Sequence, residues 1–204
     1  MPLFRRARDS SGGDSDRWVV VGLGNPGPRY EDTRHNVGVR VVEELLDRNR
    51  VSFKRHKSGC LTAETNVSDT SLVLARSTSF MNESGRPVGQ LLRWYKVTPA
   101  QLIVVHDELD IPFPQVRIKD GGGTAGHNGV NSIATHLGTK DFLRVRVGVS
   151  RPRGRQDPAD YVLSSFSVSE RKELDGVVSN AADAVERVLE VGRDRAMNEF
   201  NTRT

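Results

Sequence analysis

A histidine and an aspartate occupy the two points of this sequence that best suit acid–base chemistry. His35 lies in the stretch Thr33 to Asn36, directly before an amphipathic segment, and Thr33 is a candidate helix N-cap. The positive end of a helix dipole favours neutral imidazole, which is the form that a general base requires. The alternative is a histidine that only helps to cap the helix.

The candidate partner of that histidine is a carboxylate in the motif HDELD, residues 106–110, which closes an apolar run. Sites gather at the carboxyl ends of strands in open α/β sheets. Because His106 and Asp107 are adjacent on a strand, their side chains point to opposite faces and make poor joint metal ligands. Asp107 can instead hold one tautomer of a histidine, as in hydrolytic triads. For Glu108 and Asp110 we expect an ordinary solvated loop.

A glycine-rich loop, GGGTAGHNG at residues 121–129, suggests binding of a phosphate, because glycine leaves backbone N–H groups free to face an anion. The loop lacks the Gly-Lys-Ser/Thr ending of a P-loop, which argues against hydrolysis of a nucleoside triphosphate. Lys119 precedes the loop and Arg146 lies on a nearby strand pattern. Together they can bind one phosphate, although each alone is more often a surface charge.

Two other patterns suggest chemistry that their context argues against. Residues 22–27 match the dinucleotide-binding fingerprint G-x-G-x-x-G after a strand. In nucleotide-binding folds the helix starts within the glycine run, whereas here Pro26 and Pro28 intervene and the helical pattern starts only near Thr33. Cys60 is the single cysteine and lies in a strand-like stretch with no helix N-terminus to activate it. We therefore expect a buried structural thiol.

The elements that must position these residues alternate between short apolar runs and amphipathic stripes. The runs predict strands at 18–23, 60–66, 72–75, 102–107, 116–119 and 142–149. The stripes predict helices at 36–50, at 84–96, from the glycine-rich loop to a C-cap near Gly138, and at 169–191. This alternation predicts a single α/β domain over residues 18–204, and the hairpin at 60–75 makes its sheet mixed.

Composition and charge exclude several classes of protein. Of 204 residues, 36% are hydrophobic and 27% charged, and no apolar run approaches the ~20 residues of a membrane span. A single cysteine excludes a disulfide framework and a multi-cysteine zinc site, and fits a reducing compartment. The net charge of +4, from 30 basic and 26 acidic residues, is compatible with a polyanionic partner. Residues 1–17 are expected to be a flexible extension, the alternative being a basic arm that contacts a nucleic acid.

Five stretches of the chain, taken in order, resemble the bacterial-type peptidyl-tRNA hydrolase family: VGLGNPGPRYEDTRHNVG, SFMNESG, VVHDELDIP, the GGG…GHNG loop and LRVRVGV. The resemblance runs from Val19 to about Met197 and leaves the N-terminal extension outside. Each stretch is ordinary alone, but five in order with family-like spacing are specific. The resemblance implies a single α/β domain with a mixed, mostly parallel twisted sheet flanked by helices on both faces.

The resemblance also implies hydrolysis of the ester between a peptide and the 3′ ribose of tRNA, which recycles the tRNA for translation. It implies a cytoplasmic monomer that uses no metal or other cofactor and binds no membrane. His35 corresponds to the general base for water, and Asp107 to the carboxylate that orients it. Lys119 and Arg146 correspond to a basic pair that binds the tRNA 5′ phosphate. The residues that would bind the substrate are Asn25, Tyr30, Phe80, Met81, Asn82, His127 and Asn128.

One departure from the family pattern is the pair Thr124-Ala125, which replaces a His-Gly pair common in the loop and leaves His35 and Asp107 untouched. Two alternatives stay open. An RNA-binding protein on the same scaffold could dispense with the catalytic set, which this sequence retains. A dinucleotide-dependent oxidoreductase would show saturable binding of NAD.

Overall fold

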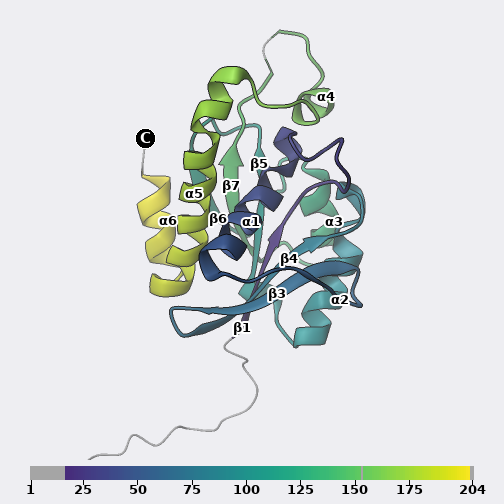
Figure 1. The fold of residues 1–204 in the computed structure, drawn as a ribbon, viewed down its shortest axis with the longest axis vertical. Helices are drawn as coiled ribbons and strands as arrows, with labels where there is room; N and C mark the ends of the chain where they lie inside the picture. The colour runs from purple at the N-terminus through teal and green to yellow at the C-terminus, as the bar shows by residue number, and fades with distance from the viewer. Residues whose placement is uncertain (1–16, 153, 203–204) are drawn as a thin grey trace, which may run out of the picture.

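Seven strands form one sheet in the order β2-β3-β4-β1-β5-β7-β6 in the computed structural model, which describes residues 17–152 and 154–202 (Figure 1). β3 and β6 run opposite to the other strands. The predicted mixed, mostly parallel sheet is therefore confirmed. The strands are β1 (Arg17–Gly22), β2 (Lys54–Arg55), β3 (Cys60–Val67), β4 (Thr70–Ser77), β5 (Leu102–Glu108), β6 (Val116–Asp120) and β7 (Leu143–Gly148).

The apolar runs become central strands because both faces of the sheet are covered. Val20, Ile103 and Val105 point to a core shared with α1 (Val37–Asn49), α5 (Val168–Val191) and α6 (Arg193–Asn201). Val19 and Val104 point to a second core under α2 (Gly85–Tyr95) and α3 (Asn128–Leu137). Figure 1 shows α5 and α6 on one side of the sheet and α2 and α3 on the other. Helices thus flank both faces, as predicted.

The predicted helices are present, with ends that differ by a residue or two. α3 ends at Gly138, whose φ of +69° confirms the predicted C-cap. Four shorter segments and α6 were not predicted, because each is too short for a clear periodic signal. The short segments are η1 (Arg34–Asn36), η2 (Met81–Glu83), η3 (Pro99–Gln101) and α4 (Pro158–Val162).

Close packing of α1 on β1 explains why glycine occupies position 22, at the end of β1, and position 38, in α1. A Cβ atom on Gly22 would lie 2.3 Å from the carbonyl oxygen of Gly38, and one on Gly38 would lie 2.2 Å from the carbonyl oxygen of Val105. Neither contact is possible, so both positions require glycine. The helix begins only at Val37, well after the glycine run. These glycines therefore serve helix–strand packing, in agreement with the argument against a dinucleotide site.

The expected extension at 1–17 lies outside the described residues except for Arg17, which already belongs to β1 and pairs with Ser71 of β4. The strand thus begins one residue earlier than the predicted boundary. No helix in the part of the chain that the structure describes combines the length and apolar character needed to cross a membrane.

Candidate active site

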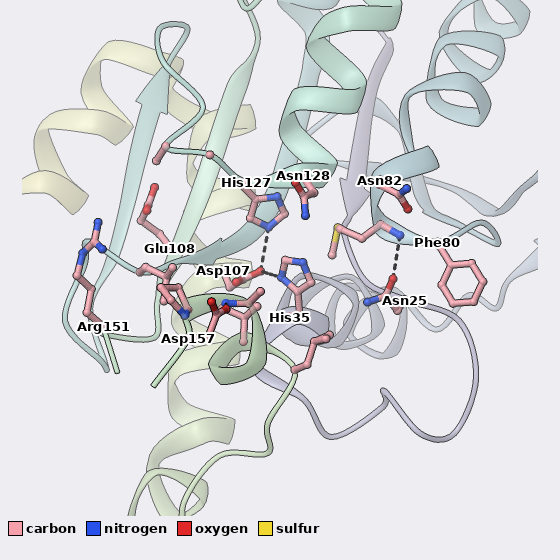
Figure 2. A pocket seen from close by; sticks show the side chains of 18 residues that line it. Asn25, His35, Phe80, Asn82, Asp107, Glu108, His127, Asn128, Arg151 and Asp157 are labelled. Atoms are coloured by element: carbon pink, nitrogen blue, oxygen red, sulfur yellow. Dashed lines mark hydrogen bonds and ion pairs between the residues drawn. The ribbon is translucent and has the colours of Figure 1, made fainter. Parts of the chain in front are cut away.

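A cavity of about 790 Å³ opens at the carboxyl ends of the parallel strands (Figure 2). Loops after β1 and β4 supply Asn25 and the segment Phe80–Asn82, and the end of β5 supplies Asp107. The start of α3, the loop after β7 and the α4 region complete the lining. The sheet therefore gathers segments that are far apart in sequence. Eight residues that the sequence analysis singled out line this cavity: Asn25, His35, Phe80, Met81, Asn82, Asp107, His127 and Asn128.

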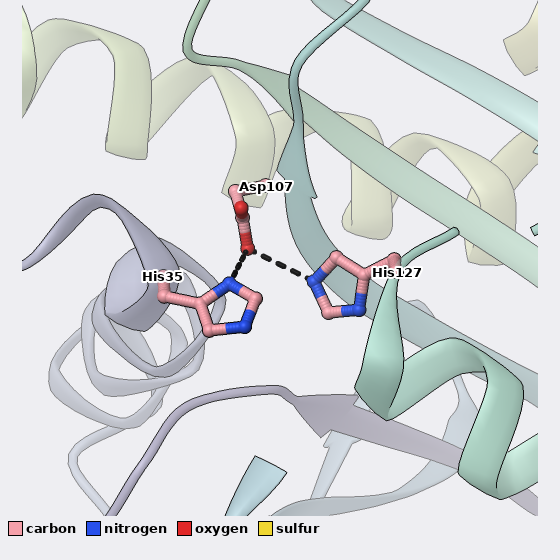
Figure 3. A group of neighbouring side chains, drawn as sticks. All are labelled: His35, Asp107 and His127. Atoms are coloured by element: carbon pink, nitrogen blue, oxygen red, sulfur yellow. Dashed lines mark hydrogen bonds and ion pairs between the residues drawn. The ribbon is translucent and has the colours of Figure 1, made fainter. Parts of the chain in front are cut away.

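Two histidines converge on one carboxylate oxygen at the floor of this cavity (Figure 3). The Nδ1 atom of His35 lies 2.8 Å from Oδ1 of Asp107, and the Nε2 atom of His127 lies 3.0 Å from the same oxygen. Asp107 is 3% exposed and His35 8%. The fold thus brings together three side chains from η1, β5 and the N-cap of α3.

Hydrogen bonds fix which nitrogen of each histidine carries the proton. A carboxylate only accepts, so Nδ1 of His35 and Nε2 of His127 are the donors. Nδ1 of His127 also accepts from the backbone N–H groups of Gly129 and Val130, so both of its nitrogens are engaged. The contact with Asp107 is the one side-chain hydrogen bond of His35 among the described residues, so its Nε2 has no partner there. His35 is therefore the histidine with a free lone pair at the cavity.

The two histidines and their hydrogen bonds to Asp107 keep its carboxylate ionised. Burial by itself would raise the pKa of Asp107, but the neighbouring His35 and His127 and their hydrogen bonds outweigh it, so the pKa lies well below its ordinary value. His106 faces a different environment. Burial and the nearby His127 hold the pKa of His106 well below its ordinary value. Its Nδ1 donates to the backbone carbonyl of Asp107 at 2.6 Å, which by itself would raise the pKa of His106, but burial outweighs this hydrogen bond.

An asparagine that sequence reasoning did not single out holds the loop after β1. The Oδ1 atom of Asn36 accepts from the backbone N–H of Asn25 at 2.8 Å, and its Nδ2 donates to the backbone carbonyl of Asn25 at 2.9 Å. Oδ1 of Asn25 in turn accepts from the backbone N–H of Met81 at 2.8 Å (Figure 2). This leaves Nδ2 of Asn25 as a donor with no acceptor in the described chain. The adjacency of Asn36 to His35 was the only signal in the sequence.

The side of the cavity formed by Asn25 and the 80–82 segment ends in an aromatic pair. Phe80 is 51% exposed, and Tyr30 packs edge-on against it with ring centroids 6.3 Å apart. Tyr30 itself is not among the lining residues. Leu163, 42% exposed, adds apolar surface to the lining. An exposed apolar surface beside polar groups is suited to binding a peptide side chain.

The predicted basic pair lies beside the cavity rather than in it. Lys119 on β6 and Arg146 on β7 share one face of the sheet, and Nη1 of Arg146 lies 3.8 Å from Oε2 of Glu108. Glu108 is buried and lines the cavity, so its expected place in a solvated loop is wrong. The cause is that β5 extends through residue 108, beside β7. Asp110 does lie in the loop and pairs with Arg151.

The glycine-rich loop carries one residue whose backbone suits glycine better. Ala125 lines the cavity with φ of +51°, in the left-handed region. It belongs to the pair Thr124-Ala125 that departs from the family pattern, and the hydroxyl of Thr124 bonds to Oδ1 of Asn131. Thr124 therefore connects the loop to α3 through a side-chain hydrogen bond.

The same three side chains are also a candidate metal site, and Cys60 is a candidate reactive thiol. Ligand atoms of His35, Asp107 and His127 lie within 4.8 Å of one another, which is close enough for a metal among the described residues. Both histidines, however, point at the same carboxylate oxygen, as in hydrogen bonding. Cys60 is buried, and this burial raises the pKa of its thiol to about 11, as expected for a structural cysteine.

Comparison with known proteins finds one family over nearly the whole chain. The family model described as peptidyl-tRNA hydrolase matches residues 19–204. A peptidyl-tRNA hydrolase of Kineococcus radiotolerans is 53% identical over 194 residues, which cover 92% of this chain and 98% of that protein. One of Leifsonia xyli is 54% identical over 187 residues, covering 91% and 97%.

Solved structures agree with the sequence relatives. The crystal structure of peptidyl-tRNA hydrolase from Acinetobacter baumannii superposes with a TM-score of 0.85 at 32% identity, and covers 94% of this chain and 98% of that one. The residues matched by the family model, 19–204, include the cavity lining and both histidines. The chain therefore belongs to the peptidyl-tRNA hydrolase family, a family of hydrolases that act on ester bonds.

Proposed function

We propose that the chain hydrolyses the ester between the peptide and the 3′ ribose of peptidyl-tRNA, with His35 as the general base. The observation that carries this proposal is the free Nε2 of His35 at the cavity, opposite an Nδ1 that donates to Asp107 at 2.8 Å. A base needs a lone pair within reach of water and a partner that stabilises the imidazolium. His127 lacks such a lone pair, because both of its nitrogens are already engaged.

The reaction follows from this arrangement. Nε2 of His35 takes a proton from a water molecule as the water oxygen attacks the ester carbonyl carbon. The carbonyl oxygen becomes an oxyanion, which Nδ2 of Asn25 is placed to stabilise because its Oδ1 is held by Met81. The oxyanion then collapses, the bond to the 3′ oxygen breaks, and His35 returns its proton to that oxygen. The products are tRNA and the peptide carboxylic acid, which releases the second proton of the water to solvent and becomes a carboxylate.

Substrate binding divides between the two sides of the cavity. We assign the peptide to the side of Phe80 and Tyr30, where apolar surface is exposed. The side-chain amides of Asn82 and Asn128 line the cavity and form no hydrogen bond within the described chain, so they can bind backbone groups of the peptide or the attacking water. We assign the 5′ phosphate of the tRNA to Lys119 and Arg146.

The decisive assay measures release of the amino acid from N-acetyl-aminoacyl-tRNA in the presence of EDTA. We expect rapid release by the wild type, and a loss on the order of 10²–10⁴-fold for His35→Ala. His127→Gln should lose less, because it removes a hydrogen-bond donor but not the base. Equal losses in the two variants would show that His35 is not the general base. Sensitivity to EDTA would reject the metal-free mechanism, and no release by folded wild type would favour RNA binding without catalysis.

The phosphate assignment has its own test. Replacing Lys119 or Arg146 by Ala should mainly raise KM for a full-length tRNA substrate, because phosphate contacts act in binding. The same variants should treat a minimal ester without a 5′ phosphate as the wild type does. An equal effect on both substrates would reject the assignment.

A further inference from the structure

Arg144 is a buried arginine without a carboxylate partner. It lies on β7, is 2% exposed, and is the largest fully buried side chain in the described chain. Buried guanidinium groups are normally paired with an acid, because removing the charge from water is costly. Within the described residues Arg144 forms no ion pair at 4.0 Å or less. Some other interaction must therefore compensate its charge.

Three consecutive backbone carbonyls provide that interaction. Nη1 of Arg144 donates to the carbonyl oxygen of Gly123 at 2.7 Å. Nη2 donates to that of Gly122 at 3.1 Å and also to that of Gly121. The loop can turn these carbonyls toward one point because Gly121 and Gly122 have φ of +60° and +79°. Arg144 thus holds the first part of the glycine-rich loop against the sheet.

The loop held in this way lies directly on the end of Lys119. A Cβ atom on Gly122 would lie 3.3 Å from Cε and 3.6 Å from Nζ of Lys119. Lys119 and Arg144 are also register partners across β6 and β7, so their side chains share one face of the sheet with that of Arg146. The loop backbone, Arg144 and the lysine ammonium therefore form one packed unit.

From these contacts we infer that Arg144 is a positioning residue: by holding the 121–123 loop, it fixes the ammonium of Lys119 for binding the terminal phosphate of the RNA substrate. The inference rests on the proposed function and on the assignment of Lys119 to that phosphate. Arg144 does not line the cavity to which the ester and the attacking water are assigned, so its loss should act on binding and not on the chemical step.

The electrostatics of the unit fit an anion as its ligand. Burial and the guanidinium groups of Arg144 and Arg146 lower the pKa of Lys119, since three cations repel one another. Two carboxylates act on this cluster: Glu108, at 3.8 Å from Arg146, and Asp120, whose charge acts on Arg144. A phosphate bound there would remove the repulsion, which gives the site affinity for a doubly charged terminal phosphate over a phosphodiester.

The test compares two forms of one substrate, N-acetyl-aminoacyl-tRNA with and without its 5′ phosphate. Arg144→Met should raise KM for the phosphorylated form about 10-fold, the effect of losing one charge-assisted contact, with kcat within about two-fold. KM for the dephosphorylated form should stay within about two-fold. Arg144→Lys should be intermediate, because an ammonium keeps the charge but cannot span three carbonyls.

Arg48→Met is the matched control. Arg48 is a partly buried arginine that binds Glu44, Asp183 and Glu186 between α1 and α5, away from the cavity. Its loss removes the same charge and lowers thermal stability, yet KM for both substrates should remain that of the wild type. An unchanged KM in Arg144→Met, or an equal rise with both substrates, would overturn the inference. The second result would make Arg144 merely structural.

Gly122→Ala tests the same inference with Arg144 intact, and decides the matter if Arg144→Met does not fold. Alanine is strained at the φ of +79° of Gly122, and its methyl group would lie 3.3 Å from Cε of Lys119, so the loop and the lysine side chain must shift and KM should again rise for the phosphorylated tRNA alone. An unchanged KM would overturn the inference. Two results with the wild type would reject earlier assignments. If the wild type has the same KM for the two tRNAs, the phosphate assignment is wrong as well. If the wild type shows no hydrolysis, the proposed function is wrong.

Discussion

Replacing Asp107 by Asn is the sharpest test of the charge beneath His35. The carboxylate lies 2.8 Å from the imidazole of His35, which becomes an imidazolium when it takes the proton of water. Coulomb attraction at this distance is about 6 kcal/mol for an effective dielectric constant of 20. The amide oxygen of Asn still accepts the hydrogen bond and retains roughly 1–2 kcal/mol. Partial screening at the cavity mouth reduces the difference further.

We therefore expect Asp107→Asn to raise the barrier by about 3–4 kcal/mol and to lower kcat about 10²–10³-fold. The assay is single-turnover release of the acylated amino acid from saturating N-acetyl-aminoacyl-tRNA, with circular dichroism to establish the fold. Asp183→Asn is the control, because this exposed carboxylate on α5 binds only Arg48 and should leave kcat unchanged. A folded Asp107→Asn protein that keeps more than about a third of the wild-type kcat would refute the role of the charge.

Three further predictions concern the residues around the site. Asn36→Ala should lower kcat/KM about 10-fold and the free energy of unfolding by roughly 2 kcal/mol, because two hydrogen bonds to the backbone of Asn25 are lost. Activity at the wild-type level would contradict the role of Asn36 in holding Asn25. Folding lowers the pKa of His106, so below about pH 6.5 the unfolded chain binds one proton more than the folded chain, and the free energy of unfolding falls with acid by up to ~1.4 kcal/mol per pH unit. In urea titrations at several pH values, the free energy of unfolding of His106→Leu should depend less steeply on pH than that of the wild type. The same dependence in both proteins would count against this role of His106. Ala125→Gly should raise the melting temperature, through relief of about 1 kcal/mol of strain at φ +51°, and a lower value would disprove the strain.

Local sequence determined the elements and the chemical groups. The apolar runs of β1 and β5, the stripe of α1 and the C-cap at Gly138 follow from periodicity and turn chemistry, which act over neighbouring residues. The resemblance of five ordered motifs was likewise enough to identify the family, and the family model and relatives confirm it. The short segment α4 escaped prediction because five residues give no periodic signal.

The roles that we assign to the individual side chains follow from contacts between distant segments, which the sequence pattern does not contain. Two histidines at sequence distances of 72 and 20 residues from Asp107 meet at one oxygen, and only their other hydrogen bonds show which keeps a free nitrogen. Glu108 was expected in a solvated loop and Arg144 was not singled out, yet pairing of β5, β6 and β7 buries both side chains. Burial and hydrogen-bond geometry depend on distant segments, so periodicity carries no information about them. That is why the sequence determined which groups the protein has, and the fold determined which of them are free to act.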